Sequence, residues 1–212
     1  LNEIYPGGFK HYEQSLRVVD VLERDGRGLN LCYETRMGIL NHTVGAPDDT
    51  LEATTVRLCD RIAYVNHDLD DSIRAGILTE EDVPARVREN CGDKNSRRIN
   101  AFISDLIANS GGGKLKMSDE MQETFNIFHA FMFSDVYTNP VAKSEENKVK
   151  GILSGLYTYY TSHPDALPDD FRGVIEHDGI ERAACDYISG MTDGYAMEKY
   201  GEIFIPFAWT VK

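Results

Sequence analysis

Apolar residues recur every three to four positions along most of the chain, which is the spacing of amphipathic helices. This pattern predicts helices over residues 13–23, 33–41, 51–75, 95–109, 119–136, 145–162 and 180–199. Turn signals rich in glycine and proline separate these stretches, and a short extended tail is expected over 203–209. No alternating segment is long enough to predict a sheet. The expected fold class is therefore all-α.

Polar residues that can cap free backbone amides mark three expected helix starts. These are Thr79 with Asp82, Ser118 with Met121, and Ser144 with Asn147. Two parts of the chain are expected from this organisation. Residues 1–78 carry the segments with candidate chemistry, and residues 79–212 form a helical accessory region.

Composition places the chain among ordinary globular proteins. It has 212 residues, of which 42% are hydrophobic and 27% are charged. No apolar run approaches the roughly 18 residues of a membrane span, and the first residues lack a secretory pattern. The cysteines are scattered without Cys-x-x-Cys spacing, which argues against a zinc knuckle or a disulfide framework; they are Cys32, Cys59, Cys91 and Cys185. We expect a soluble, cytoplasmic protein with reduced cysteines and no membrane partner.

The net charge of −13 argues against broad nucleic-acid binding, because affinity for a phosphate backbone comes from clustered lysine and arginine. It is compatible with a nucleotide, since a metal and a few converging cations can hold a triphosphate. Arg61 is the main candidate cation. Weaker candidates, each more often a plain surface charge, are Arg17, Lys148, Lys150 and Arg182.

The segment 58–71 concentrates one cation, one phenol, one imidazole and four carboxylates in a stretch with helical periodicity. At about 100° per residue, Asp60, Tyr64, His67 and Asp71 fall on one helix face, with Asp68 at its edge. Asp60 lies between apolar neighbours, and a carboxylate near a buried seam must be paired or metal-bound. The alternative is a solvated acidic helix face without chemistry.

The same segment carries a family resemblance. Asp60-Arg61-Ile62-Ala63-Tyr64 followed by residues 66–71 resembles the last metal-binding helix of the HD-domain deoxynucleoside triphosphate triphosphohydrolases, and in particular the dGTPase-like members. Segments that continue the match in family order are 8–17, 28–31, 38–43, 131–133 with 136–137, 159–160 with 163–164, and 185–193. The resemblance implies a multi-helix HD-domain-type bundle with a helical C-terminal accessory region.

The resemblance also implies a role for each matching residue. Asp60 would be a metal ligand, and Arg61 would contact phosphate oxygens. Tyr64 and Asp68 follow the ligand by four and eight positions, where the family reads the deoxyribose, with the carboxylate accepting from the 3′-hydroxyl and the phenol lying under C2′. His11 would be a catalytic residue, although Tyr12 replaces the asparagine usual at the next position.

One departure from the family pattern concerns the metal. HD domains use a histidine, then an adjacent His-Asp pair, then a distant aspartate, whereas the only His-Asp steps in this sequence are 67–68, on the expected substrate face, and 177–178, in an expected loop. We therefore interpret residues 1–78 as the C-terminal part of an HD domain whose other ligands precede it. A mixed histidine and aspartate set would suit a divalent Mn, Fe, Co, Ni or Zn ion, with Mg tolerated.

The resulting functional hypothesis is a metal-dependent hydrolase that cleaves a deoxynucleoside triphosphate to deoxynucleoside and inorganic triphosphate, working as a homo-oligomer. A second enzymatic hypothesis is an HD hydrolase of nucleoside monophosphates or cyclic nucleotides. A hypothesis from a different class is a non-catalytic helical assembly or regulatory subunit, motivated by the missing ligands. Nucleic-acid binding is the weakest of the four.

Overall fold

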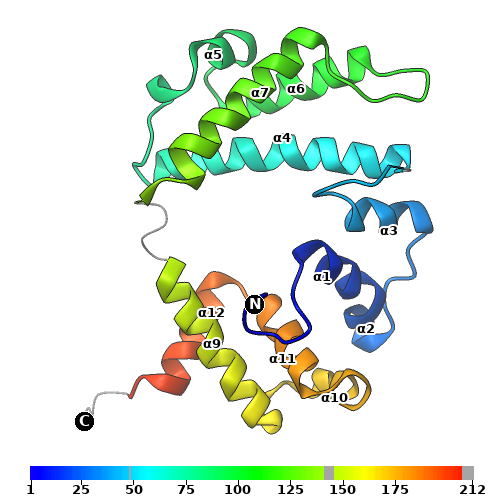
Figure 1. Cartoon of the computed structure of the whole chain (residues 1–212), viewed down its shortest axis with the longest axis vertical. Helices are drawn as coiled ribbons and strands as arrows, with labels where there is room; N and C mark the ends of the chain where they lie inside the picture. Colours follow the sequence, from blue (N-terminus) through cyan, green and yellow to red (C-terminus); the bar gives the residue numbers. More distant parts are fainter. Residues whose placement is uncertain (48, 141–145, 207–212) are drawn as a thin grey trace. The chain divides into compact units, whose positions relative to one another are not determined.

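The chain folds into helices joined by turns and loops (Figure 1). The computed structural model describes residues 1–47, 49–140 and 146–206. Within these ranges the structure holds no β-strand, only an isolated bridge between Gly111 and Lys114 in the glycine-rich loop. The all-α prediction is confirmed. None of the described helices is both long and apolar enough to cross a membrane.

The chain divides into two compact units, which we call the terminal unit, Leu1–Leu31 with Glu145–Lys212, and the central unit, Cys32–Ser144. The first and last parts of the sequence therefore fold together, and the middle part folds as a unit of its own. This spatial division differs from the predicted one after residue 78. The predicted boundary concerns the extent of a family domain, and it stays a prediction.

The central unit is built around the long helix α4 (Leu51–Arg74), which begins where Thr50 accepts a hydrogen bond from the amide of Ala53 at 3.1 Å. Its other elements are α3 (Tyr33–Leu40), the 3₁₀ turn η2 (Glu80–Asp82), α5 (Ala85–Cys91), α6 (Asn95–Asn109), α7 (Asp119–Met132) and the π-helical turn η3 (Phe133–Tyr137). Figure 1 shows α6 and α7 running along α4. The buried core between these three helices includes Ile62, Val65, Leu69, Phe102, Leu106, Phe125, Phe128 and Met132.

The terminal unit has a second core of its own. Its elements are α1 (His11–Arg17), the π-helical turn η1 (Val18–Leu22), α2 (Glu23–Gly26), α9 (Glu146–Ser162), the 3₁₀ turns η4 (Pro164–Ala166) and η5 (Asp169–Phe171), α10 (Arg172–Asp178), α11 (Ile180–Ser189) and α12 (Asp193–Phe204). Helices α9 and α11 supply most of the buried residues, namely Leu156, Tyr157, Tyr160, Ala183, Ala184, Cys185 and Ile188.

Several local predictions are confirmed. Helices appear in all seven predicted stretches, and Ser118 caps α7 by accepting from the amide of Met121 at 3.2 Å. Thr79 and Asp82 form a capping box, although the element it starts is a short 3₁₀ turn. The expected cap at Ser144 lies outside the described residues. Helical periodicity over nine or more residues was a sufficient signal.

Other predictions are wrong. The stretch 180–199 is two helices, because α11 ends at Ser189 and Thr192 starts α12 by accepting from the amide of Tyr195 at 3.2 Å. Residues 203–204 of the expected extended tail belong to α12, and 207–209 lie outside the described residues. The His-Asp step at 177–178 ends helix α10 and does not lie in a loop. Helices α5 and α10 were missed because seven residues show too little periodicity.

The cysteines differ in exposure, which leads to a testable prediction. Cys32 is exposed and Cys59 is half-buried, whereas Cys91 and Cys185 are buried. Burial raises the pKa of Cys91 to about 11 and also raises the pKa of Cys185, so their reactive thiolate forms are scarce at neutral pH. We expect a thiol reagent to modify Cys32 quickly and Cys59 slowly, and to reach the other two only after denaturation. Mass spectrometry of the labelled peptides would check this order, and labelling of Cys91 in the folded protein would contradict it.

Candidate functional site

One side of α4 carries four of the predicted site residues. The side formed by Ile62, Val65 and Leu69 is buried in the core. Arg61, Tyr64 and Asp68 are half-buried beside it, and Asp60, one turn before Tyr64, is exposed. Because the carboxylate of Asp60 is exposed, it needs neither an ion-pair partner nor a metal to offset a cost of burial. His67 and Asp71, which the sequence predicts on the same helix face, are exposed as well.

Tyr64 is held by a histidine from another helix. Its hydroxyl lies 3.1 Å from Nε2 of His129, on α7, and the two rings meet edge to face. Partial burial and the nearby charge of Arg61 lower the pKa of His129. The imidazole is therefore neutral at physiological pH, and one ring nitrogen donates while the other can accept.

Asp68 is held by a tyrosine from the π-helical turn that follows α7. The hydroxyl of Tyr137 donates to Oδ2 of Asp68 at 2.6 Å, which is the length of a charge-assisted hydrogen bond. Burial, together with this carboxylate, raises the pKa of Tyr137 well above its usual value. The phenol therefore keeps its proton and remains a donor throughout the physiological range.

Arg61 lies over an aromatic ring of the core. Its guanidinium carbon is 5.4 Å from the ring centre of Phe125, which is buried on α7. This cation–π contact orients the guanidinium and leaves its nitrogens able to bind anions. We call the six residues of this cluster the α4 site: Asp60, Arg61, Tyr64, Asp68, His129 and Tyr137.

His11 lies in the other compact unit, the terminal unit. It is the first residue of α1, it is exposed, and its ring meets the ring of Tyr12 edge to face, with centroids 5.5 Å apart. The four residues predicted on α4 thus share one helix face. His11 belongs to a different compact unit from these four residues, and its catalytic role stays a prediction.

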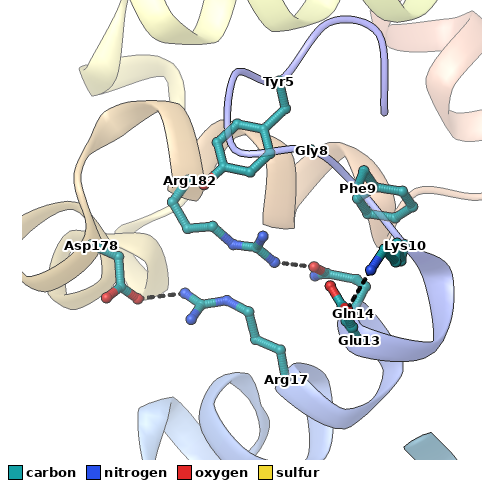
Figure 2. A pocket seen from close by; sticks show the side chains of 9 residues that line it. All are labelled: Tyr5, Gly8, Phe9, Lys10, Glu13, Gln14, Arg17, Asp178 and Arg182. Atoms are coloured by element: carbon teal, nitrogen blue, oxygen red, sulfur yellow. Dashed lines mark hydrogen bonds and ion pairs between the residues drawn. The ribbon is translucent and has the colours of Figure 1, made fainter. Parts of the chain in front are cut away.

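A charged pocket of about 360 Å³ lies beside α1 in the terminal unit (Figure 2). Arg17 binds Asp178 and Asp186, and Arg182 binds Asp186 and the side chain of Gln14. Asp186 is buried, and it binds the pocket residues Arg17, Arg182 and Gln14. Arg17 and Arg182, two of the weaker candidate cations, are therefore already paired with carboxylates, which is typical of a structural network.

The described residues do not complete a metal site. Among residues 1–47, 49–140 and 146–206, no three histidine, cysteine, aspartate or glutamate side chains converge in a way that could hold a metal ion. Asp60 offers one carboxylate. Since a divalent metal of the expected kinds needs several such ligands, Asp60 would have to share the ion with groups outside this set.

His129 and Tyr137 were missed as site residues. The sequence match at 131–133 and 136–137 pointed to the segment that includes Tyr137, but it assigned no role to either residue. His129 and Tyr137 lie 65 and 69 positions from their partners on α4. Only the packing of α7 and η3 against α4 brings them there.

Comparison with known proteins adds independent information. The phosphohydrolase-associated domain family matches residues 115–202. A deoxyguanosinetriphosphate triphosphohydrolase-like protein of Caldanaerobacter subterraneus subsp. tengcongensis is 46% identical over 210 residues, covering 99% of this chain and 62% of that relative. A protein of the same description from Clostridium perfringens (strain SM101) is 41% identical over 97% of this chain and 63% of the relative.

More distant relatives carry the same description. The one from Nitrosomonas europaea is 32% identical over 93% of this chain, and the match covers 67% of its length. The chain spans a little under two thirds of the length of the Caldanaerobacter and Clostridium relatives.

Proposed function

We propose, from the premise that this chain belongs to the HD-domain deoxyguanosinetriphosphate triphosphohydrolase-like family, that the whole protein hydrolyses a deoxynucleoside triphosphate to a deoxynucleoside and inorganic triphosphate. The observation that supports this most is the α4 site. It places a carboxylate, a guanidinium, a phenol and a second carboxylate in succession along one helix face.

The four residues that α4 itself contributes to the α4 site each suit one part of such a substrate. Asp68 would accept a hydrogen bond from the sugar 3′-hydroxyl, and the ring of Tyr64 would lie under C2′ and exclude a ribose 2′-hydroxyl by crowding. Arg61, already oriented by Phe125, would bind phosphate oxygens. Asp60 would supply one ligand to a divalent metal, whose chemistry is charge neutralisation and activation of water.

His11 completes the proposal as a catalytic residue. Its imidazole, at the exposed start of α1, could donate a proton to a phosphate or leaving-group oxygen. We further propose a cytoplasmic homo-oligomer as the working form of the protein. A helical assembly or regulatory subunit without catalysis is the alternative that the following experiment tests.

The decisive measurement is metal content and triphosphate release for the full-length protein with dGTP, dATP, dCTP, TTP and GTP. We expect release that is selective for deoxynucleotides. The Asp60→Ala variant is expected to lose bound metal and to fall about 10³-fold or more in kcat/KM, because the metal contributes several kcal/mol to the transition state and about 1.4 kcal/mol equals a factor of ten.

The matched control is Glu52→Ala, which removes an exposed carboxylate in the first turn of the same helix and should retain activity. Full activity of the Asp60→Ala variant would refute the role of Asp60. A full-length protein with neither metal nor release would favour the non-catalytic alternative.

A further inference from the structure

We infer that a polar clamp between α1 and α11 positions His11, and that Asp186 is the anchor of this clamp. The positioning residues are Gln14 and Arg17 on α1 and Arg182 and Asp186 on α11. This inference rests on the proposed function, because His11 has its catalytic role only there. It assigns a task to α11, which lies in the part of the chain that matches the phosphohydrolase-associated domain family.

Helix α1 depends on other segments for its position. It has seven residues, and isolated helices shorter than about 12–15 residues are marginal in water. Among residues 11–17, all of which the structure describes, only the polar Gln14 is buried, at 6% exposure. Since α1 gives no buried apolar side chain to the core of the terminal unit, its attachment relies on polar contacts.

The polar contacts of α1 converge on the carboxylate of Asp186. Its Oδ1 accepts from Nε2 of Gln14 at 2.8 Å, and Nε of Arg17 donates to both oxygens, at 3.1 Å and 2.9 Å. Arg182 closes the ring, since its Nη2 donates to Oδ1 of Asp186 at 2.7 Å and to Oε1 of Gln14. Figure 2 shows Arg182 directed at Gln14, and Arg17 also binding Asp178. Forked bonds of this kind fix direction as well as distance.

Asp186 can serve as an anchor because α11 is tightly packed around it. Ala183, Ala184 and Cys185, all within one turn of it, are fully buried, and Ile188 is 3% exposed. A side chain on such a segment cannot follow α1 if α1 moves, since closely packed interiors resist displacement. One carboxylate therefore fixes α1 relative to the core of the terminal unit.

The clamp sets the direction in which His11 points. Phe9, two residues earlier, packs against the core and holds the entry to α1, so the contacts of Gln14 and Arg17 chiefly fix the rotation of the helix about its axis. Side chains of an α-helix end about 5–6 Å from the axis, and a rotation of about 15° moves such an atom by about 1.5 Å. A misplacement of about 1 Å can lower a catalytic rate about 10²-fold. The clamp therefore acts on the reaction through the placement of the imidazole.

The test uses the full-length protein and the deoxynucleoside triphosphate that wild type cleaves fastest. Gln14→Leu keeps the approximate size of the side chain and removes its bonds to Asp186 and Arg182. We expect kcat to fall about 10²-fold and KM to stay within about twofold, because the α4 site, which would bind sugar and phosphates, is left intact. The matched control is Gln122→Leu, at an exposed glutamine of α7, which should keep both constants within about twofold of wild type.

A double-mutant cycle separates positioning from general destabilisation. His11→Ala alone is expected to lower kcat about 10²–10⁴-fold, as removal of a general acid or base does. In that background Gln14→Leu should cost no more than about threefold further, since no imidazole remains to be misplaced. A loss of folded protein would instead lower kcat by the same factor in both backgrounds.

Hydrogen exchange gives a readout that needs no turnover. In Gln14→Leu the amides of residues 11–17 should exchange faster, while those of residues 183–189 on α11 keep the wild-type rate. Equal acceleration in both segments would show that the unit unfolds, and it would overturn the inference.

Arg182→Lys is a second variant that guards against poor folding of the first. It keeps a positive charge beside Asp186 but lacks the planar fork that reaches both Asp186 and Gln14. We expect a loss of about 10-fold in kcat, an unchanged KM, and again no further loss in the His11→Ala background.

The outcomes separate this inference from the proposed function. Wild-type kcat in Gln14→Leu, or losses that multiply in the double variant, would overturn the inference and leave the proposed function intact. Full activity of His11→Ala would overturn the inference together with the catalytic role of His11, while the metal-dependent reaction would still be tested by Asp60→Ala. A wild-type protein that cleaves no deoxynucleotide would overturn both.

Discussion

Replacing Asp186 by asparagine is expected to destabilise the protein by about 3–5 kcal/mol, because it removes a buried carboxylate that two arginines share. Asp186 is 2% exposed, and its oxygens accept from Nε2 of Gln14 at 2.8 Å, from Arg17 at 2.8–3.1 Å and from Arg182 at 2.7 Å. Asparagine keeps the shape but leaves two partly buried guanidinium groups without their shared counter-charge.

The measurement is urea unfolding followed by circular dichroism at neutral pH. Asp178→Asn is the matched control, because Asp178 also binds Arg17 but its side chain is 36% exposed. This variant should lose no more than about 1 kcal/mol. Equal losses in the two variants would show that burial of the ion pair does not decide its contribution.

Phe128→Ala is expected to cost about 3–5 kcal/mol by removing a large side chain from the core of the central unit. Phe128 is fully buried, and its ring stacks nearly parallel to that of Phe102 at a centroid distance of 6.5 Å. Helices α4, α6 and α7 meet around it, so the cavity cannot close without moving a helix. The same urea titration measures the loss.

The control for this variant lies five residues further along the chain. Phe133 is 57% exposed at the start of η3, and Phe133→Ala should change the free energy of unfolding by no more than about 0.5 kcal/mol. A loss below about 1 kcal/mol for Phe128→Ala would show that this core repacks around the missing ring.

The long helices could be predicted because their signal is local. In α4, buried residues recur with the helical period from Ile62 through Leu69, so the sequence alone placed Asp60, Tyr64, His67 and Asp71 on one face, with Asp68 at its edge. The seven-residue helices α5 and α10 gave no such signal, and the break between α11 and α12 depends on a cap at Thr192 that a continuous apolar pattern concealed.

Two adjacent arginines show what local pattern leaves open. Arg97 is exposed beside Asp93, whereas Arg98 is fully buried and pairs with Glu80 at 3.0 Å and with Asp70 at 3.5 Å. Their identities are the same, and their environments are opposite. The partners of Arg98 come from two other segments of the chain, so its burial is tolerable only once those segments have packed around it.

The α4 site divides in the same way. Residue types and helical spacing were enough to indicate a face of α4 with candidate chemistry, because both depend on neighbours within two turns, and the family resemblance supplied the roles of Asp60, Arg61, Tyr64 and Asp68. The hydrogen bonds that His129 and Tyr137 make join side chains 65 and 69 positions apart in the sequence. They also depend on a π-helical turn that the apolar periodicity does not predict. Close packing of α7 and η3 on α4 decides which groups these four residues meet, since contact between distant segments is a property of the folded core.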